Sequence, residues 1–167
     1  MITLEKITPI ITGLMSDEIY TPNSHPVSYA LTRLESNAQG TACERAIGET
    51  MQEHGIDCEI LGGAGNDCDL IVNGMRAEVK SSRIGKNTDL YTFSKIKPDL
   101  FQILFFVFIH PSRGLVIKTV KKSDLMIFLA NKKPRKDGKG YTVTVGSDME
   151  RDDLPMTEWN PSGLVAR

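Results

Sequence analysis

One segment in the first third of the chain repeats its apolar positions with the period of a helix. Within residues 41–54 the small and apolar side chains at helical spacing are Cys43, Ala46, Ile47, Thr50 and Met51. Gly55 follows as a typical C-terminal stop, so the pattern predicts an amphipathic helix of about 14 residues. Residues 16–28 contain Pro22 and Pro26, which predict a loop without a regular element.

The remainder of the chain is dominated by strand patterns. A short strand is expected at 58–61, and Asn73-Gly74 between two β-patterned runs predicts a hairpin with a type I′ turn. Residues 82–99 are predicted as a polar connection, and the run FQILFFVFI at 101–109 predicts a strand buried on both faces. The last expected elements are a partner strand at 115–121, a short helix at 124–130 capped by Ser123, and a strand at 141–145.

This order of elements predicts a single α/β domain over residues 1–167, with a mixed central β-sheet flanked by helices. No run of residues reaches the length of a membrane span, and no basic leader precedes the first apolar stretch. We therefore expect no membrane association and a cytoplasmic location. Three widely spaced cysteines without a Cys-x-x-Cys pair predict buried thiols, and they argue against a zinc site or a disulfide framework.

The two-residue turn at Asn73-Gly74 fixes which hairpin residues face each other. One face pairs apolar residues: Val72 with Met75, Leu70 with Ala77, and Cys68 with Val79. The other face pairs Ile71 with Arg76, Asp69 with Glu78, and Asp67 with Lys80. Directly opposed side chains have Cβ atoms only about 4.5–5.5 Å apart, and opposed like charges are destabilising. We therefore expect Asp69 and Glu78 to share a proton or a cation.

A hard divalent cation such as Mg²⁺ would relieve this repulsion, because it prefers carboxylate oxygens and retains several waters. Lys80 is expected to project from the same face, within reach of a phosphate or of a water on the ion. Two carboxylates and a lysine in this arrangement suit metal-assisted phosphodiester hydrolysis. The alternative is a solvated hairpin face of mixed charge, in which Asp67 and Lys80 form a weak surface ion pair.

Asp69, followed after a short hairpin by Glu78-Val79-Lys80, resembles the signature of the PD-(D/E)XK nucleases. Residues 39–55 resemble the helix that precedes this signature, in which a Gly lies shortly before a catalytic Glu. Residues 91–125 resemble the later strands and helix of restriction-enzyme-like members. The resemblance covers about residues 40–125 and implies a restriction-endonuclease-like core, with a basic loop and tail at 131–167. Cys68 stands where the signature often has proline.

The resemblance also implies a role for each site residue. Asp69 and Glu78 would bind Mg²⁺, for which Mn²⁺ is the expected substitute, with help from the main-chain carbonyl of Val79. Lys80 would orient or activate the attacking water and stabilise charge on the phosphate. The family's acidic helix residue is ambiguous among Glu44, Glu49 and Glu53. Glu44 follows the Gly as in the family and borders the apolar stripe, so it is expected to complete the metal shell unless it is a solvated carboxylate.

The net charge of −1 gives no general attraction to nucleic acid, so DNA would be held by local patches. The candidate DNA-binding residues follow the signature or belong to a Gly- and Pro-containing basic loop: Ser81, Ser82, Arg83, Lys86, Lys132, Lys133, Arg135 and Lys136. The basic loop has an equal alternative as an ordinary solvated surface loop.

The sequence thus predicts a Mg²⁺-dependent endonuclease that hydrolyses double-stranded DNA, most like a small type II restriction enzyme. One active site in a small chain is expected to cut both strands as a homodimer on a palindromic sequence. A Holliday junction resolvase or a DNA repair nuclease of the same fold is one alternative. A nuclease-like domain that binds DNA without cutting it is another.

Overall fold

The computed structural model describes residues 19–21, 23–62, 65–135 and 138–161 of the chain. Its helices are α1 (Pro26–Thr32), α2 (Ser36–Glu53) and α3 (Lys122–Leu129), with a short 3₁₀ turn, η2 (Pro98–Leu100). Its strands are β1 (Cys58–Ile60), β2 (Leu70–Val72), β3 (Met75–Arg83), β4 (Leu90–Ile96), β5 (Ile103–His110), β6 (Gly114–Lys121), β7 (Tyr141–Gly146) and β8 (Thr157–Glu158). None of these helices is long and apolar enough to cross a membrane.

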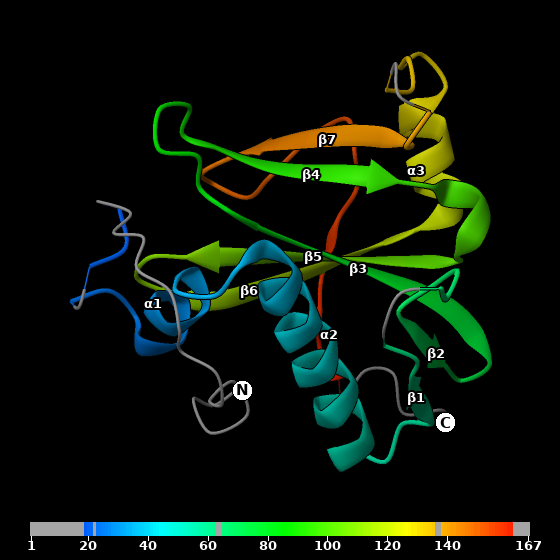
Figure 1. Ribbon diagram of the computed structural model, residues 1–167. Coiled ribbons are helices and arrows are strands. Elements are labelled where there is room, and N and C mark those ends of the chain that lie inside the picture. Colours follow the sequence, from blue (N-terminus) through cyan, green and yellow to red (C-terminus); the bar gives the residue numbers. More distant parts are fainter. Residues whose placement is uncertain (1–18, 22, 63–64, 136–137, 162–167) are drawn as a thin grey trace.

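The strands form a six-stranded central sheet in the order β1-β2-β3-β5-β6-β8 and a separate pair, β4-β7 (Figure 1). β3 and β5 are parallel, whereas the other neighbours in the central sheet are antiparallel. α2 packs against β1 and β3, and α3 packs against β6 and η2. The prediction of an α/β fold with a mixed central sheet flanked by helices is therefore confirmed.

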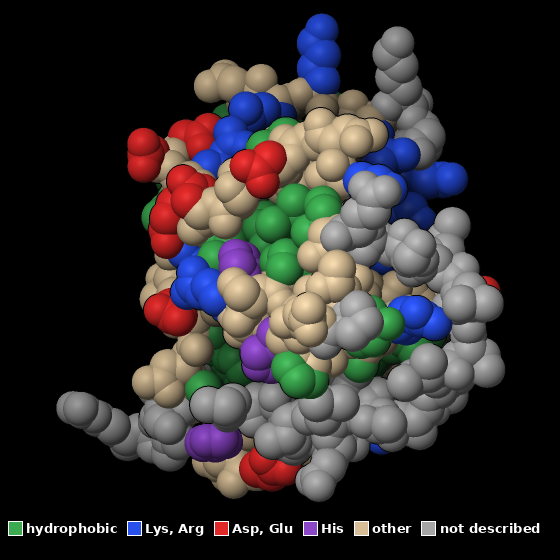
Figure 2. All heavy atoms as spheres, turned by 90° about the vertical axis from the view of Figure 1, so that its left-hand side faces the viewer, with side chains coloured by type: hydrophobic (Ala, Val, Ile, Leu, Met, Phe, Trp, Pro, Cys, Tyr) green, Lys and Arg blue, Asp and Glu red, His purple; other side chains and the backbone are tan. Residues whose placement is uncertain are grey.

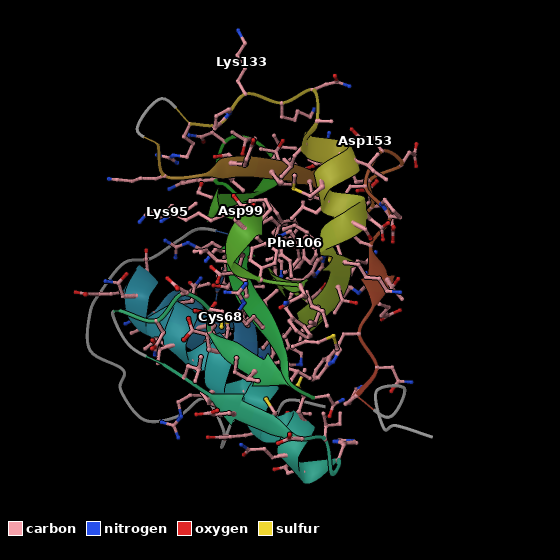
Figure 3. The ribbon with its side chains drawn as sticks, turned by 90° about the vertical axis from the view of Figure 1, so that its right-hand side faces the viewer. Cys68, Lys95, Asp99, Phe106, Lys133 and Asp153 are labelled. Atoms are coloured by element: carbon pink, nitrogen blue, oxygen red, sulfur yellow. The ribbon has the colours of Figure 1, made fainter. Side chains whose placement is uncertain are left out.

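β5 divides the interior into two hydrophobic cores. Its residues 104–109 are fully buried, which confirms the predicted strand with two covered faces. Phe105, Val107 and Ile109 belong to the core beneath α2. Leu104, Phe106 and Phe108 belong to the core formed with β4, β7 and α3. There the rings of Phe93 and Phe106 lie 4.6 Å apart between centroids, and Figure 3 shows Phe106 inside this layer.

The β2–β3 hairpin has the predicted register. Leu70 pairs with Ala77, Ile71 with Arg76, and Val72 with Met75. Asn73 and Gly74 have φ angles of 48° and 77°, as a type I′ turn requires. The expected apolar face is buried under α2 except at Met75, which lies beside the turn and is exposed.

Three local predictions were wrong. Pro26 does not prevent a helix, because proline is tolerated in the first helical turn, and His25 caps α1 by accepting a hydrogen bond from the Val27 N–H. The supposed polar connection contains β4, whose residues Tyr91 and Phe93 are buried. Ser123 does not cap α3, because the helix begins at Lys122, two residues before the predicted start, and no side chain caps it.

The other expected elements are present, with shifted ends. α2 begins at Ser36, five residues before the predicted start, and β7 occupies the predicted late strand. The three cysteines are buried and unpaired with one another, which confirms the prediction of structural thiols. In the tail, Trp159 stands edge-on to Phe105 with ring centroids 6.2 Å apart.

Candidate active site

The hairpin brings the signature residues to one place. The Asp69 N–H donates to the Ala77 carbonyl at 3.1 Å, although Ala77 already pairs with Leu70, so the regular ladder ends at Leu70 and Asp69 lies in a bend before β2. The Asp69 carboxylate then crosses to β3, where Oδ2 accepts a 2.7 Å hydrogen bond from the Val79 N–H. Asp69 is thereby fixed against the strand that carries Glu78 and Lys80. The predicted pair Asp69–Glu78 is not part of the ladder, and Asp69 reaches β3 through this side-chain hydrogen bond instead.

Glu78 and Lys80 lie on the same side of β3 and form an ion pair through Glu78 Oε1 and Lys80 Nζ. Both side chains are largely buried, with relative exposures of 13% and 23%. Burial raises the pKa of Glu78, the charge of Lys80 opposes this shift, and the charge of Asp69 adds to it. The negative charges of Asp69 and Glu78 therefore repel each other, although the two residues are not paired in the ladder.

Glu44 on α2 belongs to the same group of charges. Partial burial raises the pKa of Glu44 to about 7, the negative charges of Asp69 and Glu78 contribute to the rise, and Lys80 opposes it. Glu49 instead pairs with Arg45 at 3.0 Å, one turn along the helix. Glu53 is exposed near the end of α2, roughly 13 Å beyond Glu44 along the axis. Of the three helix carboxylates, Glu44 is the one that faces Asp69.

A polar contact that the sequence did not reveal holds α2 to β3 beside Lys80. Ser81 points toward the helix, where its Oγ accepts a 3.4 Å hydrogen bond from Gln39 Nε2. The thiol of Cys43 also bonds to the Ser81 side chain, and burial raises the pKa of that thiol to about 12. Gln39 lies one turn before Cys43 on the apolar stripe of the helix. A polar residue on an apolar stripe was the sequence signal that could have predicted this contact.

The predicted DNA-binding residues that follow the signature gather around one pocket. Ser81, Ser82, Arg83 and Lys86 line a pocket of about 480 Å³ between α2, the end of β3, and β4. Ser82 is buried, and its Oγ accepts a hydrogen bond from the Thr92 N–H at 2.9 Å, so its hydroxyl joins β3 to β4. On the neighbouring face, which bears α1, Figure 2 shows basic and acidic side chains interspersed among the coloured atoms.

The basic loop is in a different part of the molecule. Figure 3 shows Lys133 projecting from the top of the view, whereas Cys68, the neighbour of Asp69, lies near the middle. Lys132 places its Nζ 4.9 Å from the centroid of the Phe128 ring, and the Arg135 N–H donates to the Gly140 carbonyl. Lys136 lies outside the described residues. Gly140, which accepts the bond from Arg135, lies close to Lys97, so the described end of the loop borders the segment after β4.

Lys97 is a further cation near the acidic site, and sequence reasoning missed it. It lies between β4 and η2, and its charge lowers the pKa of Glu78. The sequence offered no signal for this electrostatic effect, because β4 was interpreted as a loop. The acidic site therefore has two lysines near Glu78, one from β3 and one from the segment after β4.

The residues suit a hydrated cation better than one enclosed by protein. Within the described ranges, no three or more His, Cys, Asp or Glu side chains are arranged to hold a metal ion. Mg²⁺, however, commonly uses one or two carboxylates together with waters and substrate phosphates. Asp69 and Glu78 can supply those carboxylates. Burial raises the pKa of Glu78 and the charge of Asp69 adds to the rise, so a cation between the two carboxylates would stabilise their charged forms.

Comparisons with known proteins add no family to this picture. The chain matches no model of a protein family, and no curated protein matches it.

Proposed function

We propose that this protein is a Mg²⁺-dependent DNA endonuclease with a restriction-endonuclease-like core, most like a small type II restriction enzyme. The observation that carries the proposal is the convergence of Glu44, Asp69, Glu78 and Lys80, which come from α2 and both arms of the hairpin. The resemblance to the PD-(D/E)XK signature implied this same set. Burying charged groups together is unfavourable, so the alternative of a solvated hairpin face does not explain why two carboxylates and an ion pair are largely buried here.

The proposed roles follow from the contacts. Asp69 and Glu78 would hold Mg²⁺, with Mn²⁺ as a substitute; the bound ion would polarise a phosphoryl oxygen and lower the pKa of a coordinated water. Lys80, which bonds to Glu78 in this structure, would orient the attacking water and stabilise negative charge on the phosphate. Glu44 would bond to that water or to a second one, and its pKa of about 7 allows it to accept a proton near neutral pH.

DNA would lie across the acidic site and along the pocket at the end of β3. Arg83 and Lys86 line this pocket and would supply cationic contacts to the phosphate backbone. The basic loop with Lys132, Lys133 and Arg135 would contact more distant phosphates. We propose a two-fold homodimer in the cell cytoplasm, because each chain carries one candidate site and a double-strand cut requires two.

Digestion of unmethylated double-stranded DNA with and without Mg²⁺ tests this proposal. The wild type should give discrete fragments only with the cation, and Asp69→Asn and Lys80→Ala should each lower the rate by at least about 100-fold. Asp67→Asn is the matched control, because Asp67 is exposed and only two residues from Asp69. Calorimetric titration should show Mg²⁺ binding to the wild type and to Asp67→Asn but not to Asp69→Asn.

The other outcomes are equally informative. Selective cutting of a four-way junction would assign a resolvase, whereas attack on damaged duplexes alone would assign a repair nuclease. DNA binding without cutting would leave a non-catalytic nuclease-like domain. Unchanged Mg²⁺ binding in Asp69→Asn would rule out the metal site described above.

A further inference from the structure

Lys97 occupies a corner of the chain beside the acidic site. It follows β4 directly and is the N-cap residue of η2, and its side chain is exposed. Among the described residues, its ammonium group has no hydrogen-bond or ion-pair partner. The Arg76 Nη2 donates to the Asp99 carbonyl at 3.5 Å, and Arg76 precedes Glu78 by two residues on β3, so η2 lies beside the part of β3 that carries Glu78. The charge of Lys97 also acts on Glu78, which is largely buried in the acidic site. An exposed cation next to a buried carboxylate is available to bind an anion that approaches the site from outside.

The backbone at this corner is held by several contacts. The pairing of β4 with β7 shifts register between Phe93 and Ile96, and Lys95 within the shift has a φ of 61°. Figure 3 shows the Lys95 side chain pointing away from the ribbon. Such a bulge changes the direction in which the following side chains point. Ile96 is fully buried, so the residue before Lys97 anchors the corner in the second core.

Gly140, just before β7, closes the corner from the other side. A Cβ atom there would lie 2.8 Å from the Ile96 carbonyl carbon and 3.1 Å from Lys97 Cγ, so only glycine permits this approach. The Lys97 carbonyl also accepts a 3.1 Å hydrogen bond from the Leu100 N–H. Lys97 Cγ therefore lies close to the backbone of Gly140, and the main chain of Lys97 is fixed, while the residue as a whole is exposed. This arrangement reduces the conformational entropy that the side chain would lose on binding a ligand.

From this geometry we infer that Lys97 is a substrate-binding residue that contacts a backbone phosphate of DNA beside the phosphate held by Lys80. The inference rests on the proposed endonuclease function and adds a contact that the signature does not contain. Lysine is a compact cation that suits a phosphate oxygen without demanding a particular base. A contact of this kind strengthens binding to any DNA sequence and makes it more sensitive to salt.

Binding of a fluorescent 20-base-pair duplex of mixed sequence tests the inference without turnover. Anisotropy is measured from 50 to 200 mM salt with Ca²⁺ in place of Mg²⁺, and gel analysis verifies that the duplex stays intact. Lys97→Ala should weaken binding several-fold and reduce the slope of log K against log salt by about one. Lys97→Arg should retain the slope, because it keeps the cation. In cleavage, Lys97→Ala should raise KM several-fold and change kcat less than KM.

Lys121→Ala is the control for the loss of one charge. Lys121 is exposed at the end of β6, two strands from β3, and lines a different pocket beside Trp159. If Lys97→Ala binds with the wild-type slope, or if Lys121→Ala loses as much, the inference is wrong. A lower free energy of unfolding with an unchanged slope would show a purely structural role for Lys97. A wild type that neither binds nor cuts DNA would refute the proposed function as well, so the two failures are distinguishable.

Discussion

The close packing of α2 on the hairpin side of the sheet makes Gly48 sensitive to a single methyl group. A Cβ at Gly48 would lie 2.7 Å from Ile60 Cδ1, still closer to Ile60 Cγ1, and 3.4 Å from Leu70 Cδ2. Ile60 is only partly buried and can rotate at a cost, whereas Leu70 is fully buried. Overpacking of this kind costs about 1–3 kcal/mol, while alanine gains about 1 kcal/mol over glycine inside a helix. We expect Gly48→Ala to lower the free energy of unfolding by about 1 kcal/mol.

Gly40 in the same helix supplies the matched control. The atom nearest to an added Cβ there is Glu44 Oε1 at 3.7 Å, an ordinary contact, so only the helix propensity changes. Gly40→Ala should therefore stabilise the protein by up to about 1 kcal/mol, which corresponds to roughly 2–4 °C in Tm. Urea unfolding followed by circular dichroism measures both variants. Equal stabilisation by the two substitutions would refute the close packing at Gly48.

Two further predictions concern titrating groups. The pKa of Glu44 is raised to about 7 in the folded protein, so its contribution to stability is fully present below about pH 4.5 and is lost as the pH rises to about 7. Urea titrations measure the free energy of unfolding of the metal-free wild type relative to that of Glu44→Gln. After allowance for solvent screening, this difference should fall by about 1 kcal/mol over the pH window. A difference that stays constant with pH would contradict the raised pKa. The Cys43 thiol, with its pKa near 12 and no exposed surface, should be alkylated at pH 8 only as fast as the protein unfolds. Mass spectrometry of partly alkylated protein would reveal faster labelling if Cys43 were accessible.

The hairpin was predictable because its information is local. Asn73-Gly74 selects a tight turn, the turn fixes the register, and the register places Asp69 opposite the segment that carries Glu78. The buried strand β5 was equally predictable, because a short apolar run of this kind is typical of a strand that is covered on both faces. Glu44 could be favoured over Glu49 from the helical stripe alone. In the structure the charge of Asp69 contributes to the raised pKa of Glu44, whereas Glu49 pairs with Arg45.

The segment between β3 and β5 was not predictable for a different reason. β4 alternates buried Tyr91 and Phe93 with polar residues, but its short run ends in a bulge at Lys95, where the strand period is lost. Its partner β7 lies about fifty residues later, so no local signal connects the two strands. Lys97 was missed as a consequence. Interactions that depend on distant pairing, such as the effect of the Lys97 charge on Glu78 and the hydrogen bond of Gln39 to Ser81, require the tertiary structure.

The packing at Gly48 and the chemistry at Glu44 are physically linked. The two residues are four apart on α2 and therefore lie on the same side of the helix, where Gly48 meets Ile60 and Leu70 and Glu44 faces Asp69. Because glycine has no side chain, the helix approaches β1 and β2 closely, and this approach helps to place a partly desolvated carboxylate beside two others. A methyl group at Gly48 that pushes α2 outward should therefore hydrate Glu44 and lower its pKa toward the ordinary value. The same small residue that permits close packing thus helps to set the charge of the candidate active site near neutral pH.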